Sequence, residues 1–264
     1  MKDHKKLNAA LKNGGGISIV FIHGNSLSVK SFVNQFSDPT LNDYNLMAID
    51  LPGHGDSPTA SDLGISYSVP NLALALAEFI NRNISSPVVL VGNSLGGNVA
   101  IEASVSVNDI RGLVLFGTAP VSCVDDISKG FLPNPVISFA FQDNLNDKII
   151  DQLYKLNHGE DTSHRGMFKT DMHRTDKRFR SSFGSSVAKG EFADEIKILQ
   201  NSDFPVAVFH AELDRITNLG YIENIEIPNL WKGRIQILKK THHLLHLLNP
   251  QEFNSLLNEF MKIT

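Results

Sequence analysis

Six short apolar runs, each bounded by turn residues, limit what this chain of 264 residues can fold into. Runs of this length between turn signals are typical of strands that are buried on both faces of a parallel sheet. Helical patterns separate most of the runs, and such alternation with short loops predicts an α/β fold with a mostly parallel, doubly wound sheet. The runs cover residues 17–22, 45–49, 87–91, 112–116, 205–209 and 234–238.

One long segment, residues 119–202, interrupts this alternation. It is too long for a single crossover, its composition shifts towards Phe, Asp, Lys and Ser, and it contains helical patterns at 144–156 and 192–199. An insertion of this kind predicts a helical cap over the carboxyl ends of the strands. Residues 1–118 and 203–264 then form the core domain. The mixed charge run at 171–180 has two interpretations. It is either a solvated helix face, or a hinge between cap and core or a polar gate over the site.

A predicted strand, a sharp turn and a predicted helix follow one another around Ser94. The sequence Gly-Asn-Ser-Leu-Gly at residues 92–96 is the G-x-S-x-G pattern that presents a serine nucleophile on a tight turn. Its glycines leave room in the turn, and the helix directs its first N–H groups towards a reacting carbonyl. An incomplete copy at 24–28 lacks the last glycine, so the context carries the prediction that Ser94 is the nucleophile.

Two further residues complete a predicted catalytic triad. Asp214 and His243 each lie shortly after a predicted strand, where open α/β sheets build their sites, and the chain order Ser, Asp, His fits the nucleophile pattern. We expect His243 to take the proton of Ser94 and Asp214 to orient the imidazole. Glu212 is the alternative acid and His242 the alternative base.

The oxyanion hole is expected to consist of two backbone N–H groups. One belongs to Leu95, the residue after the nucleophile, and the other to Asn25, in the loop after the first strand. His23, at the end of that strand, is expected to brace the loop rather than to react.

Charge and cysteine content exclude several classes of function. The formal net charge is −4, with 24 Lys and Arg against 28 Asp and Glu, so no basic surplus is available for nucleic acid. The single cysteine excludes an internal disulfide, and no apolar run has the length of a signal peptide or of a membrane span. We therefore expect a cytoplasmic protein, a monomer or a homodimer, with no nucleic-acid or membrane partner.

Three motifs together resemble the α/β-hydrolase superfamily from about residue 17 to the end of the chain. They are His-Gly-Asn at 23–25, Asp-Leu-Pro-Gly-His-Gly-Asp-Ser at 50–57 and Gly-Asn-Ser-Leu-Gly-Gly at 92–97. His243 is preferred to His242 because its distance from Pro250 matches the usual spacing in that family. A closer resemblance, to the α/β-hydrolase-type N-acyl-homoserine lactonases, is carried by residues 23–26, 66–68, 94–97, 111–113, 117–118, 130–131, 174–176, 178, 180 and 229–231.

The resemblance implies metal-free, cofactor-free hydrolysis of a small ester or lactone that carries an acyl chain. The chain departs from those lactonases in having Asp214 where they have Glu and Asn93 where an aromatic residue is expected. The cap tyrosine of the family aligns near Leu153, with Tyr154 one place away. The usual N-terminal β-hairpin is expected to be missing or degenerate. Four residues are predicted to contact substrate: Asn93, Phe131, Tyr154 and Phe168.

Three functions remain open at this point. The first is opening of an N-acyl-homoserine lactone, which would silence a quorum signal. The second is a general carboxylesterase for short or medium chains, and the third is a non-catalytic ligand-binding receptor that keeps the triad. His242 and His246 have the i, i+4 spacing of zinc ligands, but the Glu of H-E-x-x-H is absent, so no metal site is predicted.

Overall fold

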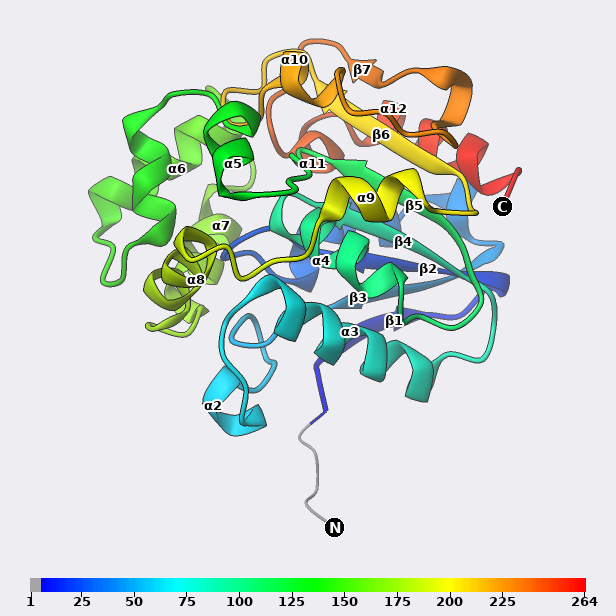
Figure 1. Cartoon of the computed structure of the whole chain (residues 1–264), viewed down its shortest axis with the longest axis horizontal. Helices are drawn as coiled ribbons and strands as arrows, with labels where there is room; N and C mark the ends of the chain where they lie inside the picture. The colour runs from blue at the N-terminus through cyan, green and yellow to red at the C-terminus, as the bar shows by residue number, and fades with distance from the viewer. Residues whose placement is uncertain (1–5) are drawn as a thin grey trace.

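The computed structural model describes residues 6–264 and contains a seven-stranded sheet with helices on both faces (Figure 1). The strand order is β1-β3-β2-β4-β5-β6-β7, and all neighbours are parallel except β1, which runs antiparallel to β3. All six predicted runs form strands, which confirms the predicted α/β-hydrolase fold. The strands are β1 Ala9–Lys12, β2 Gly15–Ile22, β3 Tyr44–Ile49, β4 Val88–Asn93, β5 Ile110–Phe116, β6 Val206–Ala211 and β7 Gln236–Leu238.

The apolar runs are continuous because the central strands are covered twice. Every residue of β4 and of β6 is buried. Along β2, Val20 and Ile22 point into the core on one face, while Ile19 and Phe21 point into the core on the other. Alternate side chains of one strand therefore serve two cores, as a doubly wound sheet requires.

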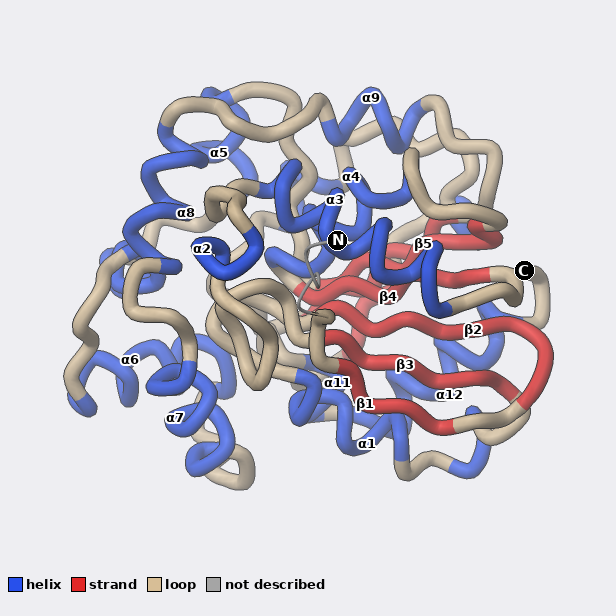
Figure 2. Tube along the Cα trace, turned by 90° about the horizontal axis from the view of Figure 1, so that it is seen from below, coloured by secondary structure: helices blue, strands red, loops and turns tan. Residues whose placement is uncertain are grey.

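Helices cover both faces of the sheet (Figure 2). One layer consists of α3 Val69–Asn83, α4 Leu95–Ser104 and α9 Glu195–Gln200, and the opposite layer of α1 Val33–Phe36, α11 Leu245–Leu248 and α12 Pro250–Met261. The remaining short elements are η1 Val29–Phe32, η2 Pro39–Leu41, α2 Ala60–Leu63, α10 Leu219–Ile222 and η4 Trp231–Gly233. No helix within residues 6–264 has the length and apolarity that a membrane crossing demands.

The segment between β5 and β6 contains a group of helices beside one end of the sheet (Figure 1). These helices are α5 Val124–Gly130, η3 Pro135–Phe141, α6 Asp147–His158, α7 Arg165–Arg174 and α8 Phe179–Ala188. A small core of their own, including Ile150, Phe168 and Met172, also takes in Leu27 and Leu244 from the main domain. The boundaries of a cap at 119–202 stay a prediction, and α9, at its end, packs against α4.

Strand β1 is absent from the prediction. Its sequence, Ala-Ala-Leu-Lys, is four residues long and has no β-branched residue, so it lacks the usual strand signal. It forms because residues 9–12 pair with 46–49 at the edge of the sheet. Since β1 pairs with β3 rather than with β2, these two strands form no hairpin with each other.

Candidate active site

The turn between β4 and α4 holds Ser94 in a strained backbone conformation. Its φ of 51° and ψ of −121° lie outside the regions that residues with a side chain prefer. The turn is tight, because a Cβ on Gly92 would come within 2.5 Å of the carbonyl oxygen of Gly96. Hydrogen bonds from Ser94 N to Phe116 O (2.9 Å) and from Gly97 N to Ser94 O (2.8 Å) fix the turn. The side chain of Ser94 is thereby presented to a cavity.

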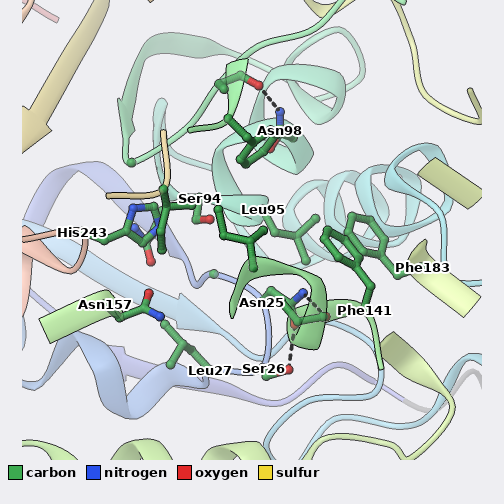
Figure 3. A pocket seen from close by; sticks show the side chains of 18 of the residues that line it. Asn25, Ser26, Leu27, Ser94, Leu95, Asn98, Phe141, Asn157, Phe183 and His243 are labelled. Carbon is green, nitrogen blue, oxygen red and sulfur yellow. Dashed lines mark hydrogen bonds between the residues drawn. The ribbon is translucent and has the colours of Figure 1, made fainter. Parts of the chain in front are cut away.

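His243 lies beside Ser94 and is oriented by Asp214 (Figure 3). The Nδ1 atom of His243 is 2.9 Å from Asp214 Oδ2, and both side chains are almost fully buried. Asp214 Oδ2 also accepts the hydroxyl of Thr217 (2.8 Å), and Oδ1 accepts the N–H of Ile216 (2.8 Å). Burial alone would raise the pKa of Asp214, but His243, His210 and the hydrogen bonds together hold it below the ordinary value. The carboxylate is therefore charged at neutral pH and keeps the Nδ1–H tautomer of His243.

The alternative acid and base lie elsewhere. Glu212 is exposed and binds Lys239 Nζ (2.9 Å) and the N–H of Lys240 (2.8 Å). The Nδ1 atom of His242 is 3.0 Å from the carbonyl oxygen of Leu213, and the residue does not line the cavity. The geometry favours Asp214 and His243 over both.

The loop after β2 lies against the turn of Ser94. A Cβ on Gly24 would be 2.8 Å from Asn93 Oδ1 and 3.3 Å from Ser94 Cβ, so only glycine permits this close approach. Asn25 and Leu95 both line the cavity (Figure 3). Among residues 6–264, neither backbone N–H donates to a protein acceptor, which leaves both available for an oxyanion. His23 accepts the N–H of Leu51 (3.0 Å) and braces this loop, as expected.

A cap residue holds the same loop, in a role that the sequence did not predict. Arg180 is 3% exposed, and in the described part of the chain it forms no salt bridge. Its Nε donates to Ser26 Oγ (3.0 Å), and Ser26 Oγ donates to Asn25 Oδ1 (2.7 Å). Ser26 itself has a φ of 58°. The chain Arg180–Ser26–Asn25 thus fixes the loop that carries a candidate oxyanion donor.

The charge run at 171–180 joins cap and core rather than facing solvent throughout. Asp171 accepts the hydroxyl of Ser28 (2.8 Å), and Asp176 accepts that of Tyr67 (2.6 Å). Of the two interpretations of this run, these contacts favour the hinge.

An apolar cavity of about 240 Å³ adjoins Ser94 and His243. Asn93, Phe131 and Phe168 line it, and their contact with substrate stays a prediction. Its further apolar lining residues include Leu27, Ile127, Phe141, Leu153, Leu156, Phe183, Val187, Phe192 and Ile216.

Tyr154, the fourth residue predicted to contact substrate, does not line the cavity. Its ring stacks on His158 with centroids 4.0 Å apart, and its hydroxyl accepts the N–H of His164 (3.3 Å). Leu153, Leu156 and Asn157 of the same helix line the cavity instead. Positions i, i+3 and i+4 share one helix face, and a shift of one residue turns the side chain about 100° away.

Three polar residues of the cavity wall were missed. Asn98 was accessible to sequence reasoning, because it lies four residues after Ser94 on the same helix face. Asn157 and Glu195 carry no local signal, since only the fold of the cap brings them to Ser94. Glu195 is 0% exposed, and burial raises its pKa to about 8.

The protonation of Glu195 predicts a pH-dependent stability. The pKa of Glu195 is higher in the folded protein, at about 8, than in the unfolded chain, near 4.5. Its contribution to the free energy of unfolding is therefore complete below pH 4.5 and is lost as the pH rises towards and through 8. Replacing Glu195 by Gln removes this dependence. In thermal unfolding, the advantage of Glu195→Gln over the wild type should grow from pH 4.5 to pH 8 and reach about 4 kcal/mol, or roughly 8 °C or more. Exposed Glu191→Gln is the control, and a constant difference across this range would contradict the assignment.

The two histidines with zinc-like spacing do not converge. His246 is fully buried, and its ring lies about 5.1 Å from that of Phe32 and 5.0 Å from that of Phe116. His242 instead contacts Leu213 near the surface. In residues 6–264, no three His, Cys, Asp or Glu side chains gather as metal ligands would.

Known hydrolases resemble the chain over most of its length. The model of the alpha/beta hydrolase family matches residues 19–256. Two structures of the N-acyl homoserine lactonase AidH, a mutant complexed with N-hexanoyl homoserine lactone and the protein complexed with N-butanoyl homoserine, both superpose with a TM-score of 0.91. Their sequence identities are 26% and 27%, and the matches cover 99% and 98% of this chain and 95% and 93% of theirs.

Curated sequences give similar levels of identity. A pimeloyl-[acyl-carrier protein] methyl ester esterase of Neisseria meningitidis is 27% identical over 225 residues, which are 83% of this chain and 84% of that protein. An acetyltransferase component of the acetoin cleaving system of Cupriavidus necator, acting on a dihydrolipoyllysine residue, is 30% identical over 129 residues. That match spans 49% of this chain and only about a third of that protein, 33%.

Proposed function

Because the chain belongs to the alpha/beta hydrolase family, we propose that it is a serine hydrolase that opens a lactone or cleaves a carboxylic ester without metal or cofactor. One observation carries the proposal. Ser94 and the buried His243–Asp214 pair meet at one apolar cavity, next to two backbone N–H groups that have no protein acceptor. This is the set of parts that acyl transfer through a serine requires.

The proposed reaction proceeds in two steps. His243 takes the proton of Ser94 as the hydroxyl oxygen attacks the carbonyl carbon, and the N–H groups of Asn25 and Leu95 stabilise the oxyanion. His243 then gives the proton to the leaving alkoxide, which in a lactone stays attached to the acyl-enzyme. Water, deprotonated by His243, releases the acid and restores Ser94.

The lead substrate is an N-acyl-homoserine lactone. The similarity to AidH, which extends over 98% of this chain, supports this choice. The size and lining of the cavity also suit a small ligand. Its volume of about 240 Å³ is smaller than the roughly 300–1,000 Å³ of sites for drug-sized ligands, and its apolar lining suits a short acyl chain. The similarity to the esterase of Neisseria meningitidis supports a general carboxylesterase as the second candidate.

The substrate is tested by incubation with N-hexanoyl homoserine lactone and mass spectrometry of the products. We expect the ligand to gain one water with its acyl amide intact, in the presence of EDTA and not with a Ser94→Ala control. Release of free homoserine lactone would instead mean amide cleavage. Turnover of simple esters alone would favour the carboxylesterase, and binding without turnover of either would favour a receptor.

Arg180 is expected to act on turnover through the oxyanion loop. Arg180→Met keeps the side-chain volume but removes the hydrogen bond to Ser26, which in turn holds Asn25. A displacement of the Asn25 N–H by less than 1 Å is expected to lower kcat about tenfold with little change in KM. Arg180→Lys should restore part of kcat. Exposed Arg178→Met is the matched control. Steady-state kinetics with p-nitrophenyl butyrate measures both constants, and a lower melting temperature with unchanged kcat would mean a structural role only.

A further inference from the structure

The cavity wall carries a carboxyl group that the proposed hydrolysis does not use. Glu195 is the first residue of α9, lines the cavity and is fully buried. The neighbouring lining residues in sequence, such as Phe192 and Val187, are apolar. A carboxyl group in such a wall is unfavourable unless something binds it.

The two oxygens of Glu195 differ in their partners. Oε2 accepts Asn98 Nδ2 (2.8 Å) and the N–H of Val121 (3.0 Å). Oε1 is buried and has no hydrogen-bond partner among residues 6–264. Buried polar atoms are nearly always paired in folded proteins, so Oε1 is short of one partner.

The protonation state makes that oxygen a donor. Burial raises the pKa of Glu195 to about 8; the hydrogen bonds from Asn98 and Val121 oppose the rise, and the neighbouring Glu102 adds to it. At pH 7 the group is therefore mainly neutral. Because Oε2 already accepts two hydrogen bonds, the proton belongs on Oε1. Tyr221 also lies near Glu195, and burial raises the pKa of its hydroxyl above the ordinary value, so it stays neutral over this pH range.

Helix α4 sets the distance between this group and the nucleophile. Asn98 follows Ser94 by four residues, and its N–H donates to Ser94 O (3.3 Å). Both residues line the cavity, and one turn of helix advances by about 5.4 Å. Figure 3 shows Asn98 and Ser94 among the side chains that line the cavity. The Asn98–Glu195 pair is thus within reach of a substituent a few bonds from the reacting carbonyl.

We propose that Glu195 is a specificity residue whose Oε1 binds an oxygen substituent, hydroxyl or keto, on the chain of the substrate that fills the cavity. This inference rests on the proposed function, because it takes the ligand of the cavity to be the substrate of a hydrolase. It narrows the substrate class from plain acyl chains to oxygen-substituted ones. Glu195 supplies a hydrogen-bond donor, and Asn98 holds it in place through Oε2.

Binding rather than turnover tests this proposal. The probes are N-methyl amides of six- to eight-carbon acids, because these amides resist hydrolysis. One set is unsubstituted, and the other carries one hydroxyl or keto group at carbon 3 or at a later carbon of the chain. Calorimetry at pH 7 measures, for each position of the substituent, the ratio of the affinities for the oxygenated and the plain ligand. At one position this ratio should be at least about tenfold higher for the wild-type protein than for Glu195→Leu. Glu102→Gln, a buried carboxyl change outside the cavity lining, should keep the preference.

The pH dependence distinguishes the two substituents. Above pH 8 an ionised Glu195 no longer donates, so the wild type should lose its preference for the keto ligand and keep that for the hydroxyl ligand. Glu195→Gln retains an N–H donor and should prefer the keto ligand up to pH 9; it also serves if Glu195→Leu fails to fold. Equal preference in all variants, or no binding of any probe, would overturn the proposal. Turnover of plain esters is measured in parallel, so a lost preference with intact turnover leaves the proposed function standing.

Discussion

Replacing Ser94 by alanine is expected to lower kcat by about 10⁵–10⁶-fold, with a folded protein that still binds its substrate. Removal of the nucleophile alone costs nearly as much as removal of a whole triad, because the members act as a unit. The measurement is kcat on p-nitrophenyl butyrate, with Ser106→Ala, an exposed position just beyond α4, as the matched control. Residual activity within tenfold of the wild type would exclude Ser94 as the nucleophile.

The same residue connects activity with stability. At a φ of 51° and a ψ of −121°, a side chain strains the backbone by roughly 1–3 kcal/mol, and glycine has no such cost. Ser94→Gly should therefore be as inactive as Ser94→Ala but melt a few degrees higher. A lower melting temperature for Ser94→Gly than for Ser94→Ala would contradict this account of the turn.

The second large effect is expected at Asp214. Asp214→Asn keeps the shape but removes the charge that stabilises protonated His243, and its amide favours the wrong imidazole tautomer; kcat should fall by about 10³–10⁴-fold. Glu212→Gln, two residues away and exposed, should retain wild-type kcat, because Glu212 contacts only Lys239 and Lys240. The reverse pattern in steady-state kinetics would transfer the role of the acid to Glu212.

The sheet and the candidate triad were open to sequence reasoning because their signals are local. A buried parallel strand is a continuous apolar run, and the turn of Ser94 needs glycines at fixed positions. The residues that follow parallel strands meet at one edge whatever lies between them, so Ser94, Asp214 and His243 could be brought together without knowledge of the cap. Strand β1 escaped because its pairing with β3, not its composition, makes it a strand.

The cavity wall was less accessible because tertiary packing decides it. The resemblance pointed to Leu153 or its neighbour on α6, and Tyr154 was selected. Leu153 lines the cavity, whereas Tyr154, one residue further along the helix, points away from it and stacks on His158. Arg180 was part of a charge run that resembles a solvated helix face, and only the fold brings it to Ser26. Glu195 lies about a hundred residues after Asn98, and no pattern in the sequence links the two.

Covalent labelling tests the central claim, that Ser94 is an activated nucleophile, most directly. A fluorophosphonate reacts with a serine only when a base and an oxyanion hole act on it. Intact-protein mass spectrometry of the wild type should find one adduct, and peptide mapping should place it on Ser94. Ser94→Ala should form none, and Asp214→Asn should react far more slowly. An unlabelled wild type, or an adduct on another residue, would contradict the account.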